Sequence, residues 1–243
     1  MKCSFEIPTC LMKKMKLPLS RSEDRDDSVH FHSVEDAPIG LQQVCDALIL
    51  GKERVVDRFL RQYKTSEFTE RITASGETAL MVAIKGGNGH IINKLVSLTP
   101  PELLDLKDNS DNTALHVVAE LDNVKAAQLL VNKNHELLNI CNRREILPIH
   151  LAAIRGHREM TSYLFSVGMK DEIHSSLPKD ADGERLMLYL VTARFYDLAL
   201  QLLGHNLEVA FSIRSPLKLL ANDPSVFPSG TSYSIWESFF YSC

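Results

Sequence analysis

A pattern of apolar residues recurs along this chain about every 35 residues, and this recurrence restricts the possible folds more than any other feature. Aligned on Gln42, Thr78, Thr113, Leu147 and Arg185, the five copies are spaced by 36, 35, 34 and 38 residues. Six columns agree in this register, among them the apolar residues two, thirteen and seventeen places after each anchor. Such a period is the signature of a solenoid, in which successive units stack and bury one continuous core.

Each copy has the pattern of a short helix, a turn and a longer second helix, because its apolar residues recur at three- and four-residue steps. Small residues five places after the anchor, such as Ala47, Ala83 and Ala152, allow neighbouring helices to approach closely. Gly87 and Gly156 lie where the first helix ends, a position that favours the left-handed conformation of glycine. The first and fifth copies are the weakest, as expected for capping units.

The best-preserved copies resemble the ankyrin-repeat family. "ETALMVA", "NTALHVVA" and "LPIHLAAIRGH" are similar to the ankyrin signature T-P-L-H-x-A-A-x-x-G-H. The resemblance implies an all-α ankyrin-repeat solenoid of about five stacked helix-turn-helix units with short finger turns. We expect a disordered N-terminal arm at 1–37, the repeat domain at 38–205 and a C-terminal linker segment at 206–243.

The segments between the copies resemble a narrower group, the plant ankyrin-repeat membrane proteins with a C-terminal PGG domain. "PPELLDLKDNSDNTALH", "NHELLNICNRREILPIH" and "FPSGTSYSIWESFFYSC" carry this similarity. It implies a non-catalytic scaffold on the cytoplasmic side of the plasma membrane that acts in defence or stress signalling, with membrane helices beyond the end of this chain. The chain alone is expected to be soluble and cytoplasmic. The alternative is a soluble adaptor that presents partners to a degradation or transcription complex.

Composition and motifs argue against several other functions. A net charge of −4 does not favour nucleic-acid binding, which needs a basic excess. Five widely spread cysteines suggest reduced thiols rather than a disulfide framework. The glycine-rich "KGGNGH" is not followed by the Lys-Ser/Thr of a phosphate loop, and no catalytic triad or metalloprotease motif is present. We therefore expect neither enzyme activity nor a cofactor.

Two histidines fall in one column of the repeat, His116 and His150. A pair of histidines can bind a metal ion. In ankyrin repeats, however, this histidine is a structural residue that ties one unit to the next turn. We favour the structural role and expect no metal, because Cys45, Met81 and Leu188 occupy the column in the other copies.

The N-terminal arm leaves a second possibility for membrane association. Cys3 and Cys10 lie close to Lys13, Lys14 and Lys16. S-acylation of these cysteines, together with the lysines, would attract the arm to an anionic membrane. The favoured alternative is a plain disordered tail.

The resemblance also implies a partner-binding surface along the concave side of the solenoid, made of finger turns and the exposed ends of the first helices. We call the following residues the partner strip: Lys85, Asn109, Ser110, Asn112, Glu120, Leu121, Arg143, Arg144, Ile154 and Arg155. We expect Arg143, Arg144 and Arg155 to receive an acidic segment of a protein partner or of the missing C-terminal region, unless they are merely solvated. Asp111 and Glu145 stand where other fingers have glycine, so those two turns are expected to be strained or shifted.

Overall fold

The computed structural model describes residues 40–62, 70–170 and 180–205. The arm predicted at 1–37 and the linker segment predicted at 206–243 lie outside the described residues. The chain divides into two compact units, 1–176 and 177–243. This division falls inside the interval 38–205 that the sequence assigns to one repeat domain, and each unit is described by itself.

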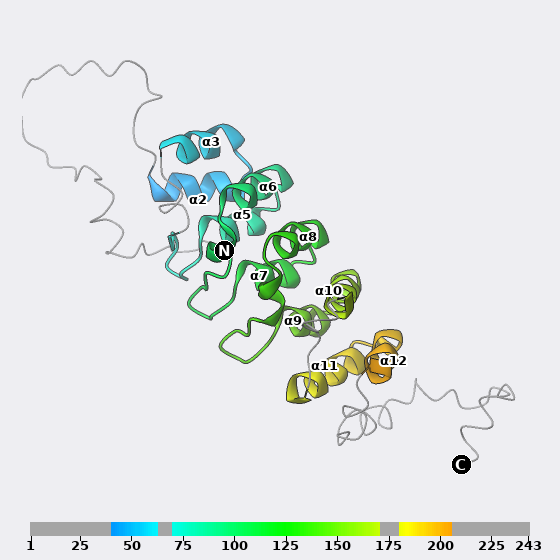
Figure 1. Cartoon of the computed structure of the whole chain (residues 1–243). Coiled ribbons are helices and arrows are strands. Elements are labelled where there is room, and N and C mark those ends of the chain that lie inside the picture. The colour runs from blue at the N-terminus through cyan, green and yellow to red at the C-terminus, as the bar shows by residue number, and fades with distance from the viewer. Residues whose placement is uncertain (1–39, 63–69, 171–179, 206–243) are drawn as a thin grey trace, which may run out of the picture. The chain divides into compact units, whose positions relative to one another are not determined.

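The first unit is built of helix pairs arranged in two rows (Figure 1). The first helices of successive pairs contact one another in one row, and the second helices form the other row. This arrangement confirms the expected all-α solenoid of helix-turn-helix units. The helix pairs are α2 (Leu41–Ile49) with α3 (Glu53–Gln62), α5 (Ala79–Gly86) with α6 (Gly89–Leu98), α7 (Ala114–Glu120) with α8 (Val124–Lys133), and α9 (Pro148–Arg155) with α10 (Arg158–Lys170). A short 3-10 helix, η1 (Pro101–Leu103), precedes α7, and a second one, η2 (His135–Asn139), precedes α9.

The second unit contains a further helix pair, α11 (Asp180–Thr192) and α12 (Tyr196–His205). The two helices pack against each other, as in the other pairs. The first helix differs from the expected pattern, since α11 has 13 residues and begins five residues before the anchor Arg185. Gly183 is therefore part of a helix and not of a finger turn.

The turn between the two helices of each pair uses one left-handed residue at the same place in the repeat. Its φ angle is 68° at Gly51, 75° at Gly87, 57° at Asp122, 76° at Gly156 and 62° at Arg194. The left-handed residue after the first helix reverses the chain, so that the second helix can pack back on the first. Asp122 and Arg194 adopt a conformation that costs a residue with a side chain more than it costs glycine.

The finger turns of the second, third and fourth pairs also share a left-handed residue. It is Gly76 with φ 78°, Asp111 with φ 62° and Glu145 with φ 56°. The two non-glycine turns therefore keep the glycine conformation instead of shifting away from it. Gly40 occupies the same repeat position in the first pair, but it has φ −71° and caps the N-terminus of α2. The first pair, as far as it is described, therefore lacks the left-handed residue of the finger turn at this position.

The core lies between the two rows, and the small residues of the repeat mark the closest helix contacts. Ala47, Ala83 and Ala152 are at most 1% exposed. Gly86 permits an even closer approach, because a Cβ atom there would lie 2.4 Å from the carbonyl oxygen of Leu48. The contact between α2 and α5 therefore depends on glycine at the end of α5.

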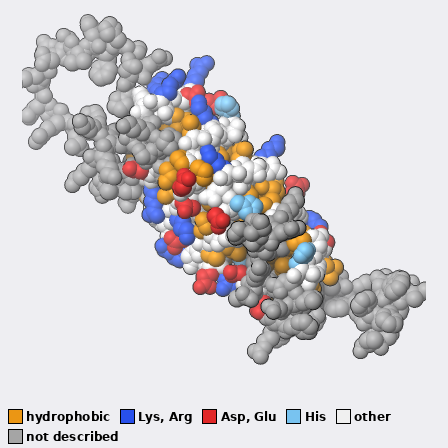
Figure 2. Space-filling model, in the orientation of Figure 1, with side chains coloured by type: hydrophobic (Ala, Val, Ile, Leu, Met, Phe, Trp, Pro, Cys, Tyr) orange, Lys and Arg blue, Asp and Glu red, His pale blue; other side chains and the backbone are white. Residues whose placement is uncertain are grey.

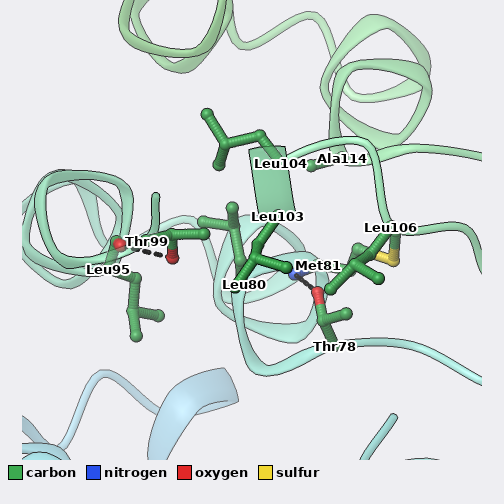
Figure 3. Close-up of a pocket in the computed structure, with 9 residues that line it drawn as sticks. All are labelled: Thr78, Leu80, Met81, Leu95, Thr99, Leu103, Leu104, Leu106 and Ala114. Atoms are coloured by element: carbon green, nitrogen blue, oxygen red, sulfur yellow. Dashed lines mark hydrogen bonds between the residues drawn. The ribbon is translucent and has the colours of Figure 1, made fainter. Parts of the chain in front are cut away.

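A small cavity lies where α5, α6, the turn after η1 and α7 meet (Figure 3). Its volume is about 10 Å³, room for a single water molecule. Two hydroxyl groups on its wall already have partners: the Thr99 Oγ1 donates to the Leu95 carbonyl at 2.8 Å, and the Thr78 Oγ1 accepts from the Met81 N–H at 3.4 Å. The remaining lining is mostly leucine, so this cavity is a packing defect of the core and not a ligand site.

Candidate functional site

The finger turns of neighbouring units are joined by hydrogen bonds. The backbone N–H of Asn109 donates to the Ser75 carbonyl at 2.9 Å, and its side-chain amide donates to the Ala74 carbonyl at 2.8 Å. One unit further on, the N–H of Arg143 donates to the Ser110 carbonyl at 3.1 Å. Asn109 and Ser110 of the partner strip therefore use backbone or amide groups to hold the fingers in a row.

Each of these fingers is also stabilised from within by a polar side chain five places before the anchor. The Asp108 Oδ1 accepts from the N–H groups of Ser110 and Asn112, both at 2.8 Å. Asn142 repeats this arrangement in the next finger and donates to the Asn112 Oδ1 at 2.9 Å. The sequence analysis missed this column, although Thr73, Asp108 and Asn142 recur with the period of the repeat and each has a short oxygen-bearing side chain.

His116 is fully buried and connects the third unit to the fourth finger. Its Nδ1 accepts from the N–H of Thr113 at 3.2 Å, and its Nε2–H donates to the Ile146 carbonyl at 3.0 Å. This pattern requires the neutral ring. Burial lowers the pKa of His116 to about 4, although the bond to the Ile146 carbonyl opposes this effect. Both ring nitrogens are occupied, so a metal ion would have to displace these bonds.

His150 lies at the same place in the fourth unit. It is fully buried, and its Nδ1 accepts from the N–H of Leu147 at 3.3 Å. Within residues 40–62, 70–170 and 180–205, no three His, Cys, Asp or Glu side chains are grouped so that they could hold a metal ion. His116 and His150 therefore occupy the same position in successive units, and each ring forms hydrogen bonds of its own.

Lys85 at the end of α5 pairs with Glu77, a carboxylate that the sequence analysis did not single out. The Glu77 side chain is only 7% exposed, whereas that of Lys85 is 51% exposed. Glu77 also accepts from the Ser75 hydroxyl at 2.8 Å and from the Thr73 hydroxyl at 3.3 Å. Burial of a carboxylate is costly unless it is paired and hydrogen-bonded, so Lys85 has a structural role in addition to its place in the partner strip.

Two of the three arginines expected to receive an acidic partner are already paired inside the chain. The guanidinium of Arg155 contacts the Glu120 carboxylate of the preceding unit. The Arg143 Nε lies 3.3 Å from the Asp111 Oδ2 in the neighbouring finger. Within the described part of the chain, Arg144 is exposed and its side chain has no acidic partner. The strip is therefore less basic than the sequence suggests.

The partner strip also exposes two large apolar side chains on neighbouring first helices. Leu121 follows α7 and is 48% exposed, and Ile154 in the last turn of α9 is 44% exposed. Leu121 adjoins Glu120 in sequence and Ile154 adjoins Arg155, and Glu120 and Arg155 form an exposed ion pair between the two units. This combination of exposed apolar and charged groups is suited to binding a protein segment.

The one acid of the partner strip, Glu120, is paired with Arg155, and the nearby His116 is buried with both ring nitrogens hydrogen-bonded. Over the described ranges, no helix combines the length and apolar character needed to cross a membrane. The visible face in Figure 2 shows basic and acidic side chains interspersed with small apolar areas.

Comparison with known proteins supports this description. A family model for ankyrin repeats, in three copies, matches residues 44–140, so the chain contains ankyrin repeats. The NAD-dependent deacetylase sir2B of Dictyostelium discoideum is 28% identical over 145 residues, which are 57% of this chain. The chain covers only 18% of the length of that relative, and so short a match assigns no catalysis. Ankyrin repeats are modules of protein–protein interaction.

Proposed function

We propose that this protein is a non-catalytic scaffold that binds a partner protein along the partner strip. The observation that carries the proposal is the exposed pair Leu121 and Ile154 beside the surface ion pair Glu120–Arg155. Apolar side chains at the centre of a contact supply most of its free energy, and polar groups around them set orientation. The fingers hold this surface in place through bonds between units, so little order has to be created on binding.

The ion pairs within the strip are compatible with an acidic segment on the partner. Both side chains of the Arg155–Glu120 pair are about half exposed. Exposed pairs of this kind contribute roughly 0–1 kcal/mol, so an incoming carboxylate can replace Glu120 at little cost. Arg144 needs no such exchange, because its guanidinium has no acidic partner among the described residues. We propose that Arg144 makes the first contact with the acidic segment and that Arg155 follows by exchange.

A matched set of variants tests the strip. Leu121→Asp combined with Ile154→Asp should abolish the capture of a partner, which can be identified by proximity labelling in cells and then tested as a purified protein. Leu98→Asp is the control, because Leu98 is equally exposed, at 45%, but lies on α6 in the other row. Equal capture by the double variant and the control would contradict the proposal. Charge reversal at Arg144 and Arg155 without loss of capture would contradict the acidic segment.

For the cellular setting we propose the cytoplasmic side of the plasma membrane in a plant defence or stress pathway. The support is the sequence resemblance of the segments between the repeats to the plant ankyrin proteins with a PGG domain. Sequencing the transcript beyond the codon for Cys243 tests this setting, since spanning helices encoded there would agree with it. Nuclear location of the intact product would instead favour a soluble adaptor of a degradation or transcription complex.

A further inference from the structure

Three arginines form a stripe along α3, in the row of second helices and away from the partner strip. Arg54, Arg58 and Arg61 follow one another at i, i+4 and i+7, so they lie within about 60° of one another around the helix. The buried residues of α3, Val56 and Phe59, lie on the opposite side. We call these three residues the arginine stripe; Arg54 and Arg61 are exposed and Arg58 is half-buried.

The acids that the structure places around the arginine stripe offset its charge only in part, through the attraction between Asp57 and Arg61. Asp57, the nearest acid on the same helix, lies 2.5 Å from the Lys94 ammonium of α6. Glu53 lies roughly a quarter-turn from Arg54 around the helix. In the described part of the chain, none of the three guanidinium groups has an ion-pair partner. Arg143 and Arg155, by contrast, are both compensated by acids of the preceding unit.

The stripe of arginines lies on α3 and does not continue along the next second helices, α6 and α8. Lys94 is engaged by Asp57, and Lys133 at the end of α8 donates to the carbonyls of Val96 and Ser97 at the end of α6. In Figure 2, basic side chains gather over α3, at the α2–α3 end of the first unit. From Arg54 to Arg61 the stripe covers eight residues of helix, or about 10 Å along the axis. This length matches a peptide segment better than the plane of a membrane.

The chemistry of the stripe also indicates its ligand. All three cations are arginines, whose planar guanidinium groups form paired hydrogen bonds to carboxylates. We propose that the arginine stripe of α3 is a second docking surface, which binds a segment of a partner protein rich in Glu and Asp. Carboxylates spaced one helical turn apart on that segment would face Arg54, Arg58 and Arg61 in turn. Through this surface the scaffold holds two protein segments at once, one on each row of helices.

A binding assay with a defined probe tests the proposal. The probe is a fluorescein-labelled peptide based on Ala and Gln with glutamates at i, i+4 and i+7, and its fluorescence anisotropy is measured with the full chain. Removing one exposed ion pair should weaken binding up to about fivefold, so the triple variant R54Q/R58Q/R61Q should weaken it by up to about a hundredfold. Binding by the wild type should also fall as salt rises above about 0.1 M.

The control variant R71Q/K125Q/R158Q removes the same charge from exposed positions outside both the arginine stripe and the partner strip. It should bind the probe as the wild type does. The strip variant L121D/I154D separates this surface from the proposed partner strip, because loss of probe binding in that variant and not in R54Q/R58Q/R61Q would place the probe on the strip and overturn the proposal. Unchanged far-ultraviolet circular dichroism of the α3 triple variant shows that folding is intact. Equal weakening by the two triple variants would overturn the proposal, as would wild-type binding by R54Q/R58Q/R61Q. Displacement of the probe by phosphatidylserine vesicles but not by excess unlabelled peptide would also overturn it.

Discussion

Glycine at position 86 allows α5 to approach α2 more closely than any other residue would. Gly86 is the last residue of α5, where its φ is not positive, so local helix preference alone would favour alanine by up to about 1 kcal/mol. We predict the opposite outcome for Gly86→Ala. The protein should become less stable, because the added methyl group meets the backbone of the neighbouring unit.

The size of the effect follows from the distances. A Cβ atom on residue 86 would lie 2.4 Å from the Leu48 carbonyl oxygen and 2.9 Å from the Ile49 Cα. Ordinary contact begins at 3.4 Å, so α5 and α2 must separate by up to about 1 Å. These neighbours are backbone atoms and cannot turn aside as a flexible side chain would. Overpacking of this kind costs about 1–3 kcal/mol, which exceeds the gain in helix preference.

Urea denaturation of the full chain gives the change in stability, and hydrogen exchange locates it. In a solenoid each unit contacts only its neighbours, so damage between α2 and α5 should release the first pair before the others. We expect amides of α2 and α3 to lose protection in Gly86→Ala, while amides of α9 keep it. Because repeat arrays can unfold in parts, the exchange pattern carries more information than a single midpoint.

Gly89→Ala provides the matched comparison. Gly89 is also helical, three residues further on, but no atom lies within 4 Å of the position that its Cβ would occupy. This variant should be neutral or gain up to about 1 kcal/mol from a reduced entropy of the unfolded chain. A Gly86→Ala protein as stable as Gly89→Ala would refute the reasoning from close backbone approach.

Two further predictions concern the interior of the stack. Ala152→Arg should lower the free energy of unfolding by about 4 kcal/mol or more, because Ala152 is 0% exposed and the arginine would both overpack the core and bury a charge. The control is Ile154→Arg on the exposed side of the same helix, which should change the urea midpoint little. The pKa of His116 is about 4, below its ordinary value of 6.5, so unfolding binds protons between these values. Stability should therefore be complete above pH 6.5 and fall by up to about 3 kcal/mol as the pH drops to 4, and a slope as steep in His116→Asn would contradict this assignment.

Much of the fold could be predicted because the relevant information is local. Gly87 and Gly156 mark left-handed turns from sequence, since few other residues take that conformation cheaply. The same logic extended to Asp111 and Glu145 predicted strained or shifted turns. Neither turn shifts, and both residues adopt the left-handed conformation, which is strained for a residue with a side chain. Hydrogen bonds within and between the fingers, such as those of Asp108 and Asn109, hold the backbone in this conformation and offset its cost.

The candidate site was less predictable, because its character depends on contacts between units. In the sequence, Arg143, Arg144 and Arg155 cannot be told apart by their surroundings. Only the stacking of the units shows that Asp111 pairs with Arg143 and that Glu120 pairs with Arg155. Likewise, only the structure shows that Glu77 is buried against Lys85. These partners, apart from the last pair, are separated by more than 30 residues, and no short pattern encodes such a pairing.

The sequence by itself determined the period, the helix pairs and the left-handed turns, because backbone preference and the spacing of apolar residues act over a few neighbouring positions. The tertiary structure decided which charges remain uncompensated and which glycine is indispensable. Asp57 pairs with Lys94 of the next unit and attracts Arg61 only from beyond ion-pair distance, so Arg54, Arg58 and Arg61 form no ion pair among the described residues. Such outcomes depend on distances between stacked units, which the repeat pattern implies only in outline.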